Sequence, residues 1–305
     1  MTEYKIQKPF LKWVGGKTQI IKDIISKIPS EINNYHELFL GGGSVLLAVL
    51  SLHKQKKIVI KNKVYAYDLN LTLINTFRQI QNNYKVVVVE VLKLKEEFKN
   101  IEINTLKQRG APKDINESNY KNTREHYYYW IRSKFNNCVK TTLESAVYFI
   151  FLNKTGFRGM YREGNNGFNI PYGLKDRKTI PGIIDENEIK KVSELIQNVK
   201  FIHCDFTSSI KNVKDGDFVY LDPPYAPVNK KSFVGYVADG FNLEMHKLLF
   251  SEIKKLGEIK FVMSNAKVDL VTENFQEYNC EDIIARRAIN SKKPGSTTTE
   301  VIIYN

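Results

Sequence analysis

The sequence predicts a doubly wound α/β sheet, because strand-like segments alternate with amphipathic helices along most of its 305 residues. Two motifs support this prediction. An apolar run ends abruptly in Asp222-Pro223-Pro224-Tyr225, and a short strand ends in a turn of three glycines at 41–43. Both would lie at the carboxyl edge of the sheet, where ligands bind in open α/β folds. With 42% hydrophobic residues, the chain is able to bury the core of one large or two modest domains.

Composition limits the class of protein. Lys and Arg number 46 against 33 Asp and Glu, and the net charge of +13 suits a polyanion binder, although a Lys-rich genome would give the same excess. Cys138, Cys204 and Cys280 match neither a disulfide framework nor a metal-ligand spacing, so we expect reduced thiols. The chain opens without an apolar signal segment, and no run reaches the roughly 18 apolar residues of a membrane span. We therefore expect a soluble, cytoplasmic protein.

The first segment ends like a phosphate-binding loop, in Gly16-Lys17-Thr18. That loop would require glycine at position 11, where this chain has leucine, so a nucleoside triphosphatase is excluded. Thr18 is predicted to cap a helix that closes at Pro29. The apolar face of this helix is expected to contain Ile20, Ile21, Ile24, Ile25 and Ile28.

The glycine turn follows a short strand at 36–40 and precedes a buried helix at 45–50. Glycine lets the backbone approach a ligand closely, and the helix N-terminus offers N–H groups. Leu46 breaks the dinucleotide fingerprint, which disfavours NAD. A strand at 58–67 then ends at Asp68, which is placed either to bind ribose hydroxyls or to cap the next helix.

Helical periodicity takes over between residues 84 and 152. We expect helices at 86–99, 123–136 and 143–152, with a polar loop at 109–122. The aromatic cluster at 127–130 could stack on bases, but aromatic residues at helical spacing are more often core, which is the interpretation we prefer.

Residues 153–173 have a different character, with five glycines, three cations and four aromatic residues but no helical period. The pattern predicts a glycine-punctuated hairpin or long loop. Interleaved Arg and aromatic side chains are suited to reading a DNA groove, and the alternative is a solvated loop.

Alternating signals return in the last third of the chain. The predicted elements are a helix at 186–196, a strand at 199–204 followed by Asp205-Phe206, the strand that ends at Asp222, a mobile loop at 226–242, a helix at 243–256, a strand at 259–263 and late strands near Ile283 and at 301–304.

Together these motifs resemble the Dam-type (D12) class of DNA adenine-N6 methyltransferases over nearly the whole chain, in the order of its alpha group. The resemblance implies a Rossmann-like, class I S-adenosylmethionine-dependent methyltransferase sheet with an inserted helical and hairpin subdomain for DNA recognition. It places the catalytic domain at 1–84 and 190–305 and the target-recognition subdomain at 85–189. The implied cofactor is S-adenosylmethionine and the implied partner is double-stranded DNA. We expect a monomer or weak dimer that requires no metal ion and does not associate with a membrane.

The resemblance also implies roles for single residues. Asp68 would bind the cofactor ribose, and Asp205 and Phe206 its adenine. The full set of implied cofactor contacts is Trp13, Lys17, Phe39, Gly41, Gly43, Asp68, Asp205, Phe206 and Asp222. The implied catalytic residues, which would hold the target base, are Asp222, Pro223, Pro224 and Tyr225.

DNA contacts are expected from the segment 153–173. Arg158 and Arg162 can each reach a guanine edge, Phe157 could wedge beside a flipped adenine, and Met160 with Pro171 could contact a thymine methyl group. GATC is the first expectation for the target site. Enzymes of the family that act on GATC tend to carry Asn where this chain has Arg158, so related sites such as CATG stay open.

The chemistry of the tetrapeptide is consistent with this resemblance. The N6 amine of adenine is a poor nucleophile, because its lone pair is delocalised into the ring. Asp222 and the Pro223 carbonyl can accept its two hydrogens, and Tyr225 can stack on a flipped-out base. The tetrapeptide alone leaves RNA or protein-amide methylation open, and a catalytically silent DNA-binding module is a further alternative.

Overall fold

The computed structural model describes residues 5–101, 115–174, 182–226, 241–286 and 297–305. The chain divides into two compact units. The first unit contains Met1–Ile6, Lys17–Leu69 and Asn198–Asn305, and the second contains Gln7–Gly16 and Asn70–Gln197. Most of the predicted loop at 226–242, and the start of that at 109–122, lie outside the described residues.

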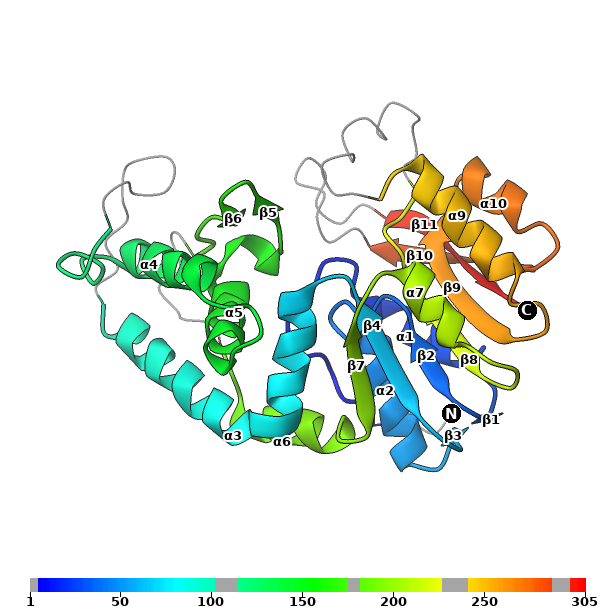
Figure 1. Cartoon of the computed structure of the whole chain (residues 1–305), viewed down its shortest axis with the longest axis horizontal. Helices are drawn as coiled ribbons and strands as arrows, with labels where there is room; N and C mark the ends of the chain where they lie inside the picture. Colours follow the sequence, from blue (N-terminus) through cyan, green and yellow to red (C-terminus); the bar gives the residue numbers. More distant parts are fainter. Residues whose placement is uncertain (1–4, 102–114, 175–181, 227–240, 287–296) are drawn as a thin grey trace. The chain divides into compact units, whose positions relative to one another are not determined.

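The first unit is built on a seven-stranded sheet with the strand order β10-β11-β9-β8-β2-β4-β7 (Figure 1). All neighbouring strands from β9 to β7 run parallel, whereas β11 is antiparallel to both β9 and β10. Every residue of β8 is buried, which explains its continuous apolar sequence. The strands are β2 (Tyr35–Glu37), β4 (Val64–Asp68), β7 (Val199–His203), β8 (Phe218–Leu221), β9 (Lys260–Ala266), β10 (Asn279–Arg286) and β11 (Thr297–Tyr304).

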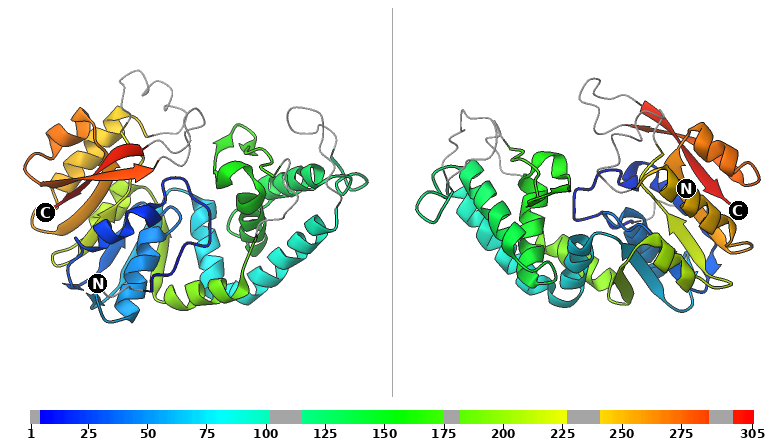
Figure 2. Two further views of the ribbon diagram at one scale, coloured as in Figure 1. Left: turned by 180° about the vertical axis from the view of Figure 1, so that it is seen from behind. Right: turned by 45° about the horizontal axis from the view of Figure 1, so that its top comes forward.

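Helices cover both faces of this sheet, so the predicted doubly wound α/β fold is confirmed (Figures 1 and 2). One face packs against α7 (Phe206–Ser209), α9 (Leu243–Lys254) and α10 (Asp269–Asn274) through a single apolar cluster. The other face carries α1 (Ile21–Ile25) and α2 (Ser44–Lys54). Burial of the apolar residues of α2 agrees with the buried helix that the sequence predicts after the glycine turn.

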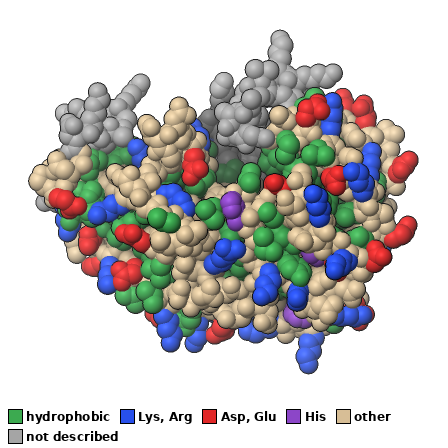
Figure 3. Space-filling view, in the orientation of Figure 1, with side chains coloured by type: hydrophobic (Ala, Val, Ile, Leu, Met, Phe, Trp, Pro, Cys, Tyr) green, Lys and Arg blue, Asp and Glu red, His purple; other side chains and the backbone are tan. Residues whose placement is uncertain are grey.

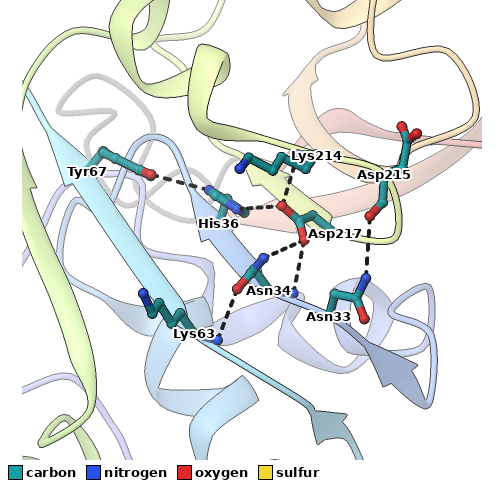
Figure 4. A network of polar contacts seen from close by, with 8 residues as sticks. All are labelled: Asn33, Asn34, His36, Lys63, Tyr67, Lys214, Asp215 and Asp217. Carbon is teal, nitrogen blue, oxygen red and sulfur yellow. Dashed lines mark hydrogen bonds and ion pairs between the residues drawn. The ribbon is translucent and has the colours of Figure 1, made fainter.

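A buried polar network joins β2 to the start of β8 (Figure 4). The carboxylate of Asp217, just before β8, accepts hydrogen bonds from the backbone N (3.1 Å) and Nδ2 (2.7 Å) of Asn34 and from the backbone N of Lys214 (3.0 Å). It also lies 3.1 Å from Nε2 of His36, whose Nδ1 is 3.3 Å from the hydroxyl of Tyr67. Burial lowers the pKa of His36, and Asp217 opposes this effect. The network ties β2, β4 and β8 together at the edge of the sheet opposite Asp222.

Two element predictions in this unit are wrong in detail. Thr18 caps no α-helix, because it lies inside the 3₁₀ turn Lys17–Gln19, and α1 ends at the half-buried Ile25, well before Pro29. The predicted strand at 58–67 is interrupted by exposed polar residues at 61–63. Its first part, β3 (Val59–Ile60), pairs with β1 (Glu31–Ile32) in a separate two-stranded sheet.

The second unit is mainly helical. It contains α3 (Leu71–Lys99), α4 (Arg124–Asn137), α5 (Leu143–Thr155), α6 (Glu186–Leu195) and the antiparallel hairpin of β5 (Glu163–Gly164) and β6 (Gly167–Phe168). The hairpin predicted within 153–173 is therefore confirmed. Helical structure begins earlier than predicted, at Leu71, but the non-helical backbone at Asn83 (φ −136°) divides α3 by a kink, and the part after the kink corresponds to the helix predicted at 86–99. Tyr127 and Tyr128 are fully buried, as expected of core residues.

The structure also bears on the cysteines, on the distribution of surface charge and on membrane-spanning segments. All three cysteines are free thiols. On the face shown in Figure 3, Lys and Arg side chains are interspersed with Asp and Glu rather than gathered in one patch. Among the described residues, no helix combines the length and hydrophobicity that a membrane crossing requires.

Candidate functional site

The tetrapeptide follows β8 directly, at the carboxyl edge where the sequence places it. Pro223 and Pro224 have no backbone N–H to pair with a neighbouring strand, so the chain leaves the sheet after Leu221. Oδ2 of Asp222 lies 2.8 Å from Nζ of Lys17, and these side chains are only 21% and 5% exposed. Burial raises the pKa of Asp222, while the Lys17 ammonium opposes that rise. Lys17, expected among the cofactor contacts, therefore pairs with the candidate catalytic carboxylate.

Tyr225 is held from two sides. Nζ of Lys17 lies 4.9 Å from the centroid of its ring, and its hydroxyl donates a hydrogen bond of 2.7 Å to Oε2 of Glu300 in β11. The next backbone N–H, of Ala226, donates to Oδ1 of Asn265 in β9 (3.1 Å). Sequence reasoning missed Glu300 and Asn265, because their contacts depend on the pairing of strands that are distant in sequence.

The glycine turn lies beside this cluster. The backbone N of Lys17 donates to Oγ of Ser44, the first residue of α2 (3.1 Å). Gly41 (φ 50°) and Gly43 (φ 71°) both adopt the left-handed conformation that favours glycine. The backbone of the turn therefore favours glycine at these two positions, independently of any ligand.

Asp68 contacts the glycine turn rather than a helix end. Its Oδ2 accepts a hydrogen bond of 2.9 Å from the backbone N of Gly41. The N-cap of α3 is Asn70, whose side chain accepts from the backbone N of Leu73 at 3.0 Å. The alternative role that the sequence left open for Asp68, as the helix cap, is therefore filled by another residue.

Three phenylalanines form an aromatic cluster in the same unit. The ring centroids of Phe39, Phe206 and Phe241 are 5.8 to 6.1 Å apart. Phe241 also packs edge-on against His246, at 4.7 Å, and burial lowers the pKa of that histidine to about 4. Phe241 was not a candidate from the sequence, and the signal that could have found it is its position one residue before Asn242, the cap of α9.

Two further acids lie near these residues. Asp205 caps α7 and accepts hydrogen bonds from the hydroxyl of Thr207 (2.6 Å) and the backbone N of Ser208 (2.9 Å), which lower its pKa. Glu37, at the end of β2, is fully buried and accepts a hydrogen bond of 2.7 Å from the hydroxyl of Tyr35. Burial holds the pKa of Glu37 well above its usual range, and the nearby carboxylate of Asp222 adds to the shift.

The candidate DNA contacts belong to the second unit. Phe157, Arg158, Arg162 and Pro171 are exposed, and Met160 is half-buried. Nε of Arg162 donates to Oδ1 of Asn169 (2.7 Å) across the hairpin, which limits the directions that the guanidinium can take. Arg158 has a left-handed backbone (φ 56°) and lies 5.1 Å from the ring centroid of Phe157.

Trp13, a candidate cofactor contact, also belongs to the second unit. Its ring stacks on Tyr161 with a centroid distance of 6.2 Å. The other candidate cofactor residues and the tetrapeptide all belong to the first unit.

Comparison with known proteins identifies the family of this chain. The model of the D12 class N6 adenine-specific DNA methyltransferases matches residues 13–289. The type II methyltransferase M.MjaIII of Methanocaldococcus jannaschii is 34% identical, covering 98% of this chain and 99% of the relative. A type II methyltransferase of Lactococcus lactis, M1.LlaDCHI, is 30% identical over 98% and 95% of the two chains, and the DNA adenine methylase of Haemophilus influenzae is 27% identical over 93% and 88%.

These matches confirm the predicted resemblance and the predicted site-specific methylation of DNA adenine. They cover the glycine turn, the helical insert and the tetrapeptide in one continuous match. The chain belongs to the D12 class of N6 adenine-specific DNA methyltransferases.

Proposed function

We propose that this enzyme methylates the N6 amine of an adenine flipped out of duplex DNA, with S-adenosylmethionine as the methyl donor and a short, GATC-like target site. The observation that supports this proposal most strongly is the cluster of Asp222, Tyr225 and Lys17 directly after β8. It places a carboxylate and an aromatic ring side by side, next to the glycine turn. The test is sequencing-based mapping of N6-methyladenine after expression in a methylation-free host, and a genome without new N6-methyladenine would contradict the proposal.

The residues of the first unit fit S-adenosylmethionine. The Asp68 carboxylate, at the end of a strand, suits the ribose hydroxyls. Phe39, Phe206 and Phe241 supply apolar ring faces for an adenine, with Asp205 at its edge. The glycines at 41 and 43 leave no side chain where backbone and ligand approach. When bound, the cofactor supplies an electrophilic methyl group on a sulfonium.

The tetrapeptide would activate the amine of the target base. Oδ1 of Asp222 and the carbonyl of Pro223 would accept the two amino hydrogens, which localises the lone pair on N6. An ionised Asp222 is the stronger acceptor, and the Lys17 ammonium favours this form against the effect of burial. Tyr225 would stack on the flipped base and hold its amine in place.

Mutation of Asp68 tests the cofactor site. Asp68→Ala should weaken S-adenosylmethionine binding by roughly 1 to 3 kcal/mol, because a charge-assisted hydrogen bond is lost, with little change in the single-turnover rate at saturating cofactor. Calorimetric titration measures the affinity. Asn70→Ala is the matched control, since it removes the cap of α3. It should lower the free energy of unfolding by about 1 kcal/mol and leave the affinity for the cofactor unchanged. Unchanged affinity in Asp68→Ala would remove this residue from the cofactor site.

Within the predicted target-recognition subdomain (85–189), we propose that Arg162 contacts a guanine edge, with Arg158, Phe157, Met160 and Pro171 as its neighbours on the DNA. Arg162→Ala should cost about 1 to 3 kcal/mol on the cognate site and relax one base position. Methylation rates on a panel of single-base variants of the target duplex measure both effects. The control is Lys191→Ala, an exposed cation of α6 in the same unit. Equal weakening on every duplex, with a flatter salt dependence, would instead indicate a phosphate contact.

The acting species is proposed to be a monomer or weak dimer in the cytoplasm. Sedimentation with and without a target duplex would measure the oligomeric state.

A further inference from the structure

We propose that Glu300 is a positioning residue for the target base, because its carboxylate holds the hydroxyl of Tyr225 and so sets the plane of the ring on which the flipped adenine stacks. The inference rests on the proposed function, in which Tyr225 is the stacking residue.

Tyr225 needs such a contact because the sheet does not hold it. β8 ends at Leu221, four residues earlier, and the intervening prolines donate no backbone hydrogen bonds. The Lys17 ammonium contacts the face of this ring, and the hydroxyl is the atom through which a neighbouring acceptor can fix the direction of the ring. The 2.7 Å hydrogen bond to Oε2 of Glu300 supplies that restraint at the tip of the ring.

Glu300 itself is well anchored. It lies within β11 and is paired on one side with Ala266 of β9 and on the other with Ile283 of β10. Pairing on both sides fixes its backbone, so the carboxylate is presented from a rigid element. Asn265, next to Ala266, accepts the hydrogen bond from the backbone N of Ala226. The chain after β8 therefore crosses the carboxyl end of β9 and is held by a side chain from each of β9 and β11.

Two variants of Glu300 distinguish its hydrogen bond to Tyr225 from the effect of its negative charge on Asp222. Glu300 is a second acid near Asp222, so its removal takes away a negative charge as well as a hydrogen-bond acceptor. Glu300→Gln removes only the charge, since the amide oxygen can still accept from the Tyr225 hydroxyl. The glutamine variant therefore tests the loss of charge alone, and the alanine variant tests the loss of the charge and of the hydrogen bond together.

The experiment measures single-turnover methyl transfer, together with the fluorescence of 2-aminopurine at the target position of a cognate duplex. Glu300→Ala should slow transfer by about tenfold or more, as expected for a lost hydrogen bond to a charged group, and should change the fluorescence of the bound base. Glu300→Gln should keep most of the rate. Tyr225→Phe should match Glu300→Ala, and combining the two should cost nothing further.

Tyr220→Phe is the matched control. It removes another buried tyrosine hydroxyl from the same sheet, one that contacts Oγ of Ser264 at 3.0 Å, and it should leave both readouts unchanged. The inference is overturned if Glu300→Ala costs as much in the Tyr225→Phe background as in the wild type, or if Tyr225→Phe keeps the full rate while Tyr225→Ala loses it. A full rate in Tyr225→Ala would instead contradict the stacking role in the proposed function.

Discussion

Replacing Asp222 by alanine is expected to lower the single-turnover rate of methyl transfer by at least about a hundredfold, while duplex DNA is still bound. The carboxylate is used as the amine of the target base changes shape, so its loss affects the transition state more than the bound complex. Tritium transfer from labelled S-adenosylmethionine measures the rate, and fluorescence anisotropy measures DNA affinity.

The control for this variant must address folding, because the alanine removes the carboxylate that forms an ion pair with the buried Lys17 ammonium. Asp222→Ala combined with Lys17→Met removes both charges, and thermal unfolding of both variants shows whether the sheet is intact. Asp269→Ala changes an exposed acid of the same unit and should keep the full rate. A near-normal rate in folded Asp222→Ala would exclude the carboxylate from the mechanism.

A second large effect is expected at the opposite edge of the sheet, on stability rather than rate. Asp217→Ala should lower the free energy of unfolding by about 3 to 5 kcal/mol, because it removes the acceptor shared by Asn34, Lys214 and His36. Urea unfolding followed by circular dichroism gives this free energy.

Asp215→Ala is its matched control, two residues away in the same turn. Its side chain is exposed, and the contact from Asn33 reaches its backbone carbonyl, which alanine keeps (Figure 4). This control should change stability by less than about 0.5 kcal/mol. Similar losses in the two variants would mean that the buried network contributes nothing specific.

Local pattern was sufficient to predict the sheet, the glycine turn and the exit from β8. A fully buried strand has a continuous apolar sequence, and two prolines end it, so both features are visible without tertiary information. The glycine turn is equally local, because the left-handed backbone at Gly41 and Gly43 restricts the residue type directly.

Features that depend on tertiary structure were missed or left open. Asp68 and Asn70 are equally good helix caps by residue type, and only the backbone geometry assigns the cap to Asn70. Thr18 also looked like a cap, but the preceding Lys17 is buried against Asp222 and the chain there forms a 3₁₀ turn. The contact between Tyr225 and Glu300 follows from strand order, which neither residue's neighbours in the sequence reveal.

The hydrogen bonds between Lys12 and Asn153 bear on how the second unit could be exchanged between relatives. The backbone N of Lys12 donates to Oδ1 of Asn153 (2.9 Å), and Nδ2 of Asn153 donates to the carbonyl of Lys12 (2.7 Å). Phe10 packs edge-on against Phe77 of α3, at 5.3 Å. Residues 7–16 are thus built into the second unit although the first unit separates them from it in the sequence. A chimaera that transplants only 70–197 would separate these residues from their partners, so the second unit has to be exchanged as two fragments.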